Sequence, residues 1–331
     1  MNGKNKIEVA ALGELLIDFT MVDADADGYP TLAAHPGGAP ANFLATLSKL
    51  GVKTAMLGKV GDDKFGSVLA DTLIKHGIDT SGLIHDKSVF TTLAFVTLDS
   101  KGDRDFSFAR KPGADTCISF DEIDTSIIDD AKVFHFGSLS LTDEPARSAT
   151  YKAVEYAKKQ GKIISYDPNL RKPLWNDLDE AKKQILWGLS LADVVKISDD
   201  EVEFLFGLEP SAGAEYIMSN YNTKLVFVTC GENGCYYRNA LASGYSQSFN
   251  AVTVVDTTGA GDVFAGSVVY KLLQYGKAPE ALSNAELDDI ARFASVNAGL
   301  SVAKQGGISG IPEPEDVMKI LKGNSYENNC K

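Results

Sequence analysis

Short apolar runs rich in β-branched residues alternate with longer amphipathic segments along most of the chain. The short runs predict buried strands, and the longer segments repeat apolar residues at the spacing of a helix. The predicted strands span residues 7–12, 54–58, 132–136, 163–166, 194–197 and 225–229. The predicted helices span residues 40–50, 64–76, 144–160, 178–189, 200–206 and 211–221. This order predicts a doubly wound α/β fold, in which helices flank a mostly parallel sheet.

Two segments interrupt this alternation, at about residues 15–36 and 88–113. Residues 92–98 show a short alternating β pattern, and a polar turn follows at residues 99–103. Since a hairpin outside a parallel sheet is a natural lid, we expect these segments to form a small β-sheet lid. No internal repeat or low-complexity linker divides the chain, so we predict one domain over residues 1–331.

The most informative stretch lies late in the chain and combines small residues with a carboxylate. Residues 251–255 predict a strand, and the apolar spacing that follows, through Tyr275, predicts a helix. Gly259 and Gly261 leave backbone N–H groups open to an anion, which the helix dipole also favours. Asp262 is then a candidate general base, with a pKa that we expect the helix N-terminus to lower. An ordinary glycine turn capped by Asp262 would carry the same local pattern.

Composition narrows the choice of partners. The chain has 331 residues, 44% of them hydrophobic, and a formal net charge of −13. This acidic balance disfavours nucleic acid and anionic membranes as partners, since both bind clustered basic charge. We see no apolar run of the roughly 18 residues that span a membrane, and no signal-peptide core. The four cysteines form no CxxC pair, which favours reduced thiols and predicts a cytoplasmic protein.

Two polar groups in the first part of the chain are candidates for binding a small polar ligand. Asp18 closes the first predicted strand, at the edge of an open α/β sheet where ligands bind. Its carboxylate could accept hydrogen bonds from two neighbouring hydroxyls. Gly37 and Gly38 precede Asn42, which lies in the first turn of a predicted helix and can both donate and accept. A surface-turn aspartate and a glycine loop with a capping asparagine are the alternative interpretations.

Two motifs in this order and spacing resemble the paired signatures of the ribokinase-like carbohydrate kinases, also called the phosphofructokinase-B family. They are GGAPAN at residues 37–42 and DTTGAGD at residues 256–262. The likeness covers essentially the whole chain. The segments that most resemble the fructokinases of this family are residues 58–66, 92–98, 135–140 and 167–171. A P-loop and the third glycine of a dinucleotide-binding fingerprint are both missing from the sequence.

The resemblance implies an ATP-dependent sugar kinase, most similar to fructokinase, that converts D-fructose and ATP to fructose 6-phosphate and ADP. It implies in-line phosphoryl transfer with Asp262 as general base and with Gly259, Ala260 and Gly261 as the anion hole. Mg²⁺ is implied as a cofactor, often with K⁺ as an activator. Members of this family commonly pair through the exposed strand edges of their lids, so a homodimer is also expected.

The same resemblance assigns binding residues by matched position. The sugar-binding positions are Asp18, Gly38, Asn42, Arg104, Arg171 and Asp262. The nucleotide-binding positions are Asn169, Thr229, Gly231, Gly234, Gly261 and Ser295. The metal positions are Glu201, for Mg²⁺ through water, and Asp256 and Thr258, for K⁺. Ser198 and Ser295 stand where the family usually has asparagine, and the second exchange leaves nucleotide selectivity open.

Other functions stay open. Within the family the substrate could be ribose, 2-keto-3-deoxygluconate or tagatose 6-phosphate. An acidic substrate would need extra cations, for which the candidates are Arg104, Arg110 and Arg171. A non-catalytic sugar- or nucleotide-sensing homologue is disfavoured by the presence of Asp262 and Asn42. A dinucleotide-dependent oxidoreductase is disfavoured by the missing fingerprint after the first strand.

Overall fold

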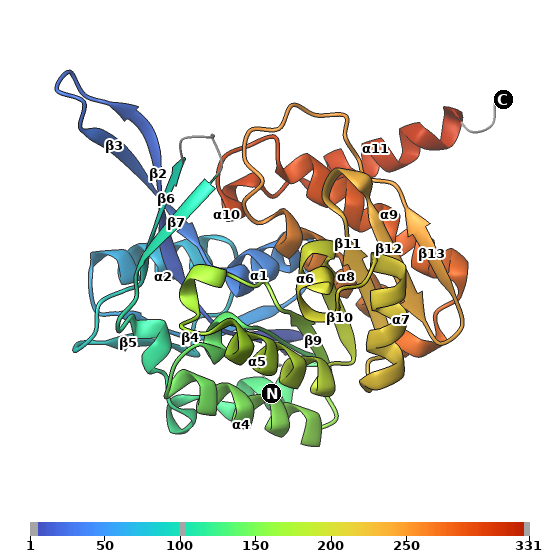
Figure 1. The fold of residues 1–331 in the computed structure, drawn as a ribbon, viewed down its shortest axis with the longest axis horizontal. Helices are drawn as coiled ribbons and strands as arrows, with labels where there is room; N and C mark the ends of the chain where they lie inside the picture. Colours follow the sequence, from blue (N-terminus) through green and yellow to red (C-terminus); the bar gives the residue numbers. More distant parts are fainter. Residues whose placement is uncertain (1–5, 99–103, 328–331) are drawn as a thin grey trace, which may run out of the picture.

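Two β-sheets organise the chain in the computed structural model, which describes residues 6–98 and 104–327 (Figure 1). Across these residues the large sheet has nine strands in the order β13-β12-β11-β10-β9-β8-β1-β4-β5. The neighbours from β11 to β5 run parallel, and β12 and β13 run antiparallel. The strands are β1 (Val9–Leu12), β4 (Thr54–Gly61), β5 (Leu83–Asp86), β8 (Val133–Gly137), β9 (Ile163–Asp167), β10 (Val194–Ser198), β11 (Leu225–Thr229), β12 (Cys235–Asn239) and β13 (Ser243–Ser246).

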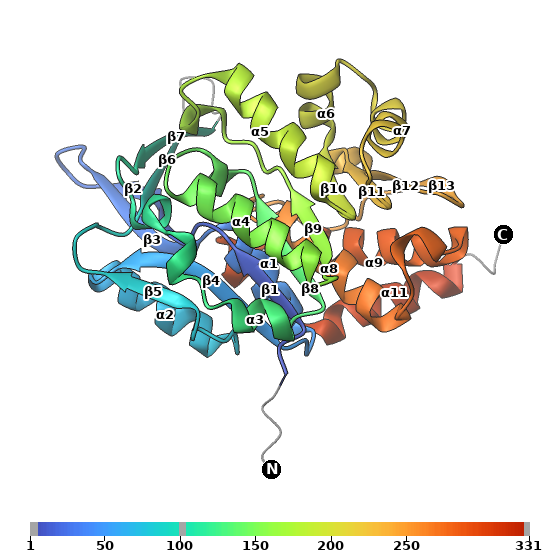
Figure 2. The same ribbon diagram turned by 90° about the horizontal axis from the view of Figure 1, so that it is seen from below.

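Helices cover both faces of this sheet, as Figure 2 shows from below. One face carries α3 (Thr125–Asp130), α4 (Ala146–Lys159), α5 (Leu178–Leu191), α6 (Asp199–Phe206) and α7 (Pro210–Asn220). The other carries α1 (Ala39–Lys49), α2 (Lys64–Lys75), α8 (Ala260–Tyr275) and α9 (Asn284–Ser301), followed by α10 (Gly307–Gly310) and α11 (Pro314–Glu327). In β1, Ala10 and Leu12 pack in the first core cluster, and Val9 and Ala11 pack in the second. A strand buried on both faces needs this unbroken apolar run. The predicted doubly wound fold is confirmed.

The second sheet has four strands in the described residues, in the order β3-β2-β6-β7. The strands are β2 (Leu16–Ala24), β3 (Pro30–Gly37), β6 (Leu93–Leu98) and β7 (Arg104–Ala109). The β2–β3 hairpin projects from the body of the molecule (Figure 1). The predicted lid segments contain these strands, apart from Gly37 at the end of β3. The turn predicted at residues 99–103 lies outside the described residues.

One predicted strand is wrong. Residues 251–255 form no strand, although their sequence is β-branched and apolar. Val254 and Val255 are each 60% exposed, and the N–H groups of Val255 and Asp256 donate to the Val302 carbonyl rather than to a neighbouring strand. Val252 and Val254 instead line a pocket, so their apolar side chains serve a cavity wall rather than a sheet.

Within the described residues, no helix combines the length and apolar character required to cross a bilayer.

Candidate active site

Two pockets meet at the N-terminus of α8. The larger, of about 970 Å³, is lined by residues from both ends of the chain, among them Asp18, Asn42 and Asp262. The smaller, of about 600 Å³, extends from the same helix toward β11 and α9. Thr257 and Gly261 line both pockets. The turn before α8 therefore separates two cavities that could hold two reacting molecules next to each other.

The sheet topology explains why these residues converge. Asp167 ends β9, Ser198 ends β10 and Thr229 ends β11, so all three lie at the carboxyl edge of parallel strands. In an open α/β sheet this edge forms the ligand crevice. Ser198 and Thr229 line the larger and the smaller pocket, respectively, and Asp167 lies beside them.

The start of α8 leaves backbone donors open to a ligand. Gly259 caps the helix with a φ of 81°, and a Cβ there would lie 2.9 Å from the Gly307 Cα. The Ala260 N–H donates to the Thr257 carbonyl at 3.3 Å. Among the described residues, the N–H groups of Gly261 and Asp262 have no such backbone acceptor, as expected in a first helical turn. Together with the helix dipole, these two amides can bind an anion.

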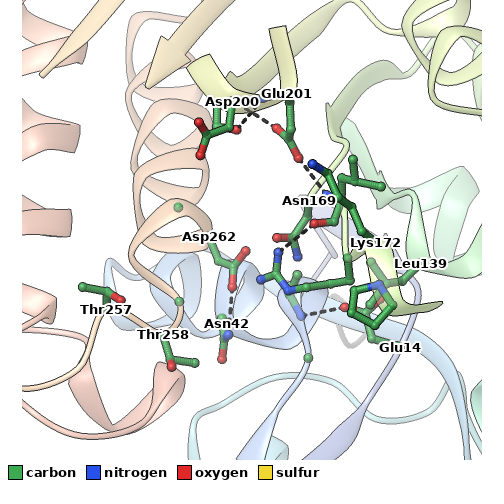
Figure 3. A pocket seen from close by; sticks show the side chains of 18 of the residues that line it. Glu14, Asn42, Leu139, Asn169, Lys172, Asp200, Glu201, Thr257, Thr258 and Asp262 are labelled. Carbon is green, nitrogen blue, oxygen red and sulfur yellow. Dashed lines mark hydrogen bonds between the residues drawn. The ribbon is translucent and has the colours of Figure 1, made fainter. Parts of the chain in front are cut away.

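Asp262 faces Asn42 in the larger pocket (Figure 3). The Asn42 Nδ2–H donates to Asp262 Oδ2 at 2.8 Å, although the two residues are 220 positions apart. Burial, and next the charge of Asp167, raise the pKa of Asp262 to about 7, against the hydrogen bond from Asn42. The predicted lowering of this pKa is wrong. Removing the carboxylate from water costs more than the helix dipole returns, because the dipole is worth only about 0.3–2 kcal/mol.

The amide of Asn42 is held by close packing against two loops. A Cβ on Gly307 would lie 2.5 Å from both Asn42 Oδ1 and Nδ2, so only glycine fits there. Asn42 Oδ1 is buried and has no hydrogen-bond partner among the described residues. An orphaned buried acceptor at a pocket wall points to a ligand donor such as a hydroxyl.

Asp18 lies in β2 of the lid sheet, and not at the end of the first core strand where we expected it. It lines the larger pocket together with Gly38 and Arg171. Burial raises the pKa of Asp18 to about 6, with the charge of Arg171 opposing the rise. A Cβ on Gly37 would lie 2.2 Å from Asp18 Oδ2, so the GGAPAN motif leaves room for this carboxylate.

Glu201 lies on the opposite wall, near Asn169 (Figure 3). Its Oε1 accepts the Leu170 N–H at 2.7 Å, and its Oε2 accepts the Ser198 N–H at 2.8 Å. Both oxygens therefore hold backbone, which fits contact with a metal through water better than direct ligation. Asn169 adopts a φ of 46°, the one positive φ of a non-glycine residue in the described chain. Such strain commonly marks a functional site.

Asp256 joins the turn before α8 to the loop before α10. Its Oδ1 accepts the Thr258 N–H at 2.8 Å and its Oδ2 accepts the Gly306 N–H at 2.9 Å. The carboxylate is buried between these two loops. This donor chemistry is compatible with a monovalent cation between the two loops.

The smaller pocket contains five of the six residues predicted to bind a nucleotide, and the sixth, Asn169, lines the larger pocket. The smaller pocket is lined by Thr229, Gly231, Gly234, Gly261 and Ser295. Its other walls are mainly apolar, from Phe249, Val252, Val254, Phe264, Ala298 and Val302. The smaller pocket is therefore mainly apolar and reaches Gly261 at the start of α8. Such a cavity suits a planar base with phosphates attached, because the phosphates can bind the helix N-terminus.

Comparison with known proteins agrees with this geometry. The model of the pfkB family of carbohydrate kinases matches residues 6–314. The chain belongs to that family. It is 43% identical to probable fructokinase-2 of Arabidopsis thaliana, over 97% of this chain and 98% of that protein. Among solved structures, fructokinase with bound ATP from Xylella fastidiosa has a TM-score of 0.88 at 30% identity, covering 96% of this chain and 99% of that one.

A second solved structure carries more ligands. It is a double-mutant fructokinase from Vibrio cholerae O395 in the fructose, ADP and potassium ion bound form. Its TM-score is 0.84 at 29% identity, and the match covers 96% of this chain and 99% of that chain. Family membership and the ribokinase-like fold, both expected from the two sequence motifs, are thus confirmed.

Arg104 and Arg110 are two of the arginines that this pfkB-family chain offers as candidate cations for an acidic substrate. The side chain of Arg104 lies outside what the structure describes, although its backbone begins β7. Arg110 does not line the larger pocket: it is buried, with its guanidinium 2.7 Å from Asp115 and 2.8 Å from Thr142. We therefore assign Arg110 to the structure of the lid base and not to a substrate anion.

Sequence reasoning missed a buried ion pair at the pocket. Lys196 Nζ lies 3.1 Å from Asp167 Oδ2, and the two side chains are 10% and 4% exposed. Burial by itself would lower the pKa of Lys196, but the charge of Asp167, with that of Glu201, raises it above the ordinary value. The signal was present in the sequence, since a lysine interrupts the apolar run of β10. Burying a lysine costs free energy unless an opposite charge pairs with it, so a lysine in a buried strand indicates a second charged group nearby.

Sequence reasoning also missed a second buried charged residue at the pocket, Glu14. It lines the larger pocket, its Oε1 accepts the Ala39 N–H at 2.9 Å, and burial raises its pKa to about 7. The carboxyl supports the backbone at the start of α1, which carries Asn42.

Proposed function

We propose that this pfkB-family chain is an ATP-dependent fructokinase that makes fructose 6-phosphate. The observation that carries the proposal is the contact between Asp262 and Asn42, which joins the two family motifs in one pocket beside Asp18. The names of relatives 39–43% identical to nearly the whole chain support fructose as the sugar. A sensing role without catalysis would give no reason for a buried carboxyl at this helix start.

In the proposed reaction a sugar hydroxyl oxygen attacks the γ-phosphorus of ATP in line with the leaving oxygen of ADP. One P–O bond forms and one breaks, and Asp262 takes the hydroxyl proton. A pKa of about 7 suits a base that works at neutral pH. The amides of Gly261 and Asp262 would receive the negative charge of the transferring group, with Gly259 and Ala260 shaping their turn.

The sugar would be held by Asp18, Gly38, Asn42 and Arg171, with Arg104 as a further candidate from the lid. The nucleotide would occupy the smaller pocket, against Thr229, Gly231, Gly234 and Ser295, with Asn169 near its phosphates. Mg²⁺ would neutralise phosphate charge, held through water by Glu201, whose carboxylate is already fixed by two backbone N–H groups. Asp256, with Thr258, would hold K⁺ between two loops.

A coupled assay of ADP release over a panel of sugars tests the substrate. We expect fructose to give the highest kcat/KM among fructose, ribose, 2-keto-3-deoxygluconate and tagatose 6-phosphate, with stimulation by K⁺. The phosphorylated position is read from the product by ³¹P and ¹³C NMR. Preference for another sugar would replace fructose, and no turnover with any sugar would favour a sensing homologue.

Three further proposals concern the whole protein. We propose one domain over residues 1–331 with the small sheet as its lid, and a homodimer through that lid. The hairpin exposes Met21, Val22 and Tyr29 by 54%, 53% and 69%, and a second lid could cover these apolar side chains. Light scattering of wild type and of a Met21→Lys/Tyr29→Lys variant tests the dimer, which the variant should weaken.

The free thiols of Cys117, Cys230 and Cys235 support a cytoplasmic location, tested by cell fractionation.

A further inference from the structure

A buried ammonium lies directly against the turn that is proposed to bind the transferring phosphoryl group. A Cβ on Gly261 would lie only 2.8 Å from Lys196 Nζ, so glycine is what lets the ammonium approach this backbone. Gly261 also offers one of the two open amides of α8, and both Gly261 and Lys196 line the larger pocket. Two positive groups, an ammonium and a helix N-terminus, thus lie side by side at one point of the cavity wall.

This arrangement is electrostatically unfavourable unless negative charge joins it. Asp167 supplies part of that charge, at 3.1 and 3.3 Å from Nζ. An ammonium has three N–H donors, and among the described residues Asp167 is the only hydrogen-bond or ion-pair partner of this one. In a protein of net charge −13, a cation kept at this place indicates an anionic ligand.

Lys59 shows what a purely structural buried lysine looks like in the same protein. It also interrupts an apolar strand, β4, and its side chain is 4% exposed. Its ammonium contacts Glu122 at 2.6 Å, the Cys117 carbonyl at 3.0 Å and Asp86 at 3.4 Å. Lys59 is absent from both pockets. Lys196, by contrast, has one partner and a pocket in front of it.

We propose that Lys196 is a catalytic residue that contacts the transferring phosphoryl group, and that Asp167 is a positioning residue for it. The inference deepens the proposed kinase function and rests on it. During transfer, Nζ faces the equatorial oxygens of the γ-phosphoryl group while its bond to the ADP oxygen breaks and its bond to the sugar oxygen forms. The proton leaves the sugar hydroxyl for Asp262, and Lys196 keeps its own protons throughout. The charge on the phosphoryl oxygens is met from two sides, by the ammonium and by the α8 amides.

The test compares Lys196→Met and Lys196→Arg with Lys59→Met as matched control. Loss of a charged transition-state donor costs on the order of 10²–10³ in kcat, so we expect this fall in Lys196→Met, with the KM for the sugar near that of wild type. Lys196→Arg should recover part of the kcat. Lys59→Met should lower the melting temperature while the folded enzyme keeps the wild-type kcat.

The pH profile provides a readout that a structural role would not move. The charges facing Asp262 are Asp167, which raises its pKa, and Lys196 and Arg171, which lower it. The acid limb of kcat/KM should therefore shift to higher pH in Lys196→Met and to lower pH in Asp167→Asn. Melting curves and ATP binding by calorimetry show whether each variant is folded.

Failure of this inference and failure of the proposed function give different results. If wild type prefers another sugar, the same comparison is made with that sugar. A folded Lys196→Met enzyme with wild-type kcat would overturn the role of Lys196, whichever sugar is used. Acid limbs that move in the same direction in the two variants would overturn the role of Asp167.

Discussion

Asp262 should destabilise the folded protein above neutral pH, and its replacement by asparagine should reveal this cost. Burial, with the charge of Asp167, raises the pKa of Asp262 from 3.8 to about 7. A carboxyl with a higher pKa in the folded than in the unfolded chain stabilises the fold fully only below the unfolded pKa. That stabilisation is lost as the pH rises through the folded pKa, here between about pH 4 and pH 7.

The size of the effect follows from the two pKa values. At about 1.36 kcal/mol for each pH unit between them, ionised Asp262 costs up to about 4 kcal/mol at pH 8. Asparagine removes this charge and can still accept the Asn42 N–H through its own side-chain oxygen. An unfolding entropy of about 2.1 cal/mol/K per residue gives roughly 0.7 kcal/mol/K for 331 residues. The Asp262→Asn variant should therefore melt up to roughly 6 °C higher than wild type at pH 8.

The assay is a melting curve without ligands at pH 8 and at pH 5, for wild type, Asp262→Asn and the control Asp71→Asn. Asp71 is exposed on α2, so its variant should behave as wild type at both pH values. The gain for Asp262→Asn should shrink strongly at pH 5, where wild-type Asp262 is mostly protonated. An equal gain at both pH values, or none at pH 8, would refute the reasoning from burial.

Catalysis should show the opposite dependence. In wild type, kcat/KM should fall about tenfold for each pH unit well below pH 7, because only ionised Asp262 can take the proton. Asp262→Asn should lose about 10²–10⁴ in kcat while becoming more stable. A wild-type kcat/KM profile that stays flat down to pH 5 would show that Asp262 has an ordinary pKa in the free enzyme.

Three further changes have defined outcomes. Gly259→Ala forces a Cβ to 2.9 Å from the Gly307 Cα at a φ of 81°, so we expect a loss of about 1–3 kcal/mol in urea unfolding and little remaining activity. Asp256→Ala should abolish stimulation by K⁺, measured as the ratio of kcat with KCl to kcat with tetramethylammonium chloride; an unchanged ratio would place the cation elsewhere. Asn169→Gly should keep the backbone at φ 46° and lose mainly kcat, whereas Asn169→Ala should also lower the melting temperature.

The sequence predicts the core of this fold well because strict periods leave few alternatives. The strand predicted at residues 225–229 matches β11 at both ends, and the helix predicted at residues 211–221 matches α7 within one residue. A five-residue apolar run before a helix is weaker evidence for a strand. Residues 251–255 have the same composition as a buried strand, but they form no strand, and Val252 and Val254 line the smaller pocket. Composition alone cannot distinguish a sheet from a cavity wall.

The sequence likewise predicts some features of the candidate site and not others. The glycines and Asn42 were predictable because their roles depend on backbone shape and on a short motif, and the structure brings them to one place. The pKa of Asp262 was not, since it depends on burial and on Asp167, which is 95 positions away along the chain. The role of Lys196 likewise becomes visible only from the coordinates, in which a Cβ on Gly261 would lie 2.8 Å from its ammonium. Long-range electrostatics needs coordinates.

The two missed charges also explain how the pocket can hold a base with a raised pKa. Burial raises the pKa of Asp262 most and the negative charge of Asp167 raises it further, but that negative charge would also repel a phosphoryl group. Asp167 raises the pKa of Asp262, and Lys196, held by Asp167, offers positive charge on the side of the α8 amides. One ion pair thus serves both needs, because its negative end acts on the base and its positive end acts on the phosphate. An Asp167→Asn/Lys196→Met double variant should therefore move the acid limb back toward its wild-type position, compared with either single variant, without restoring kcat.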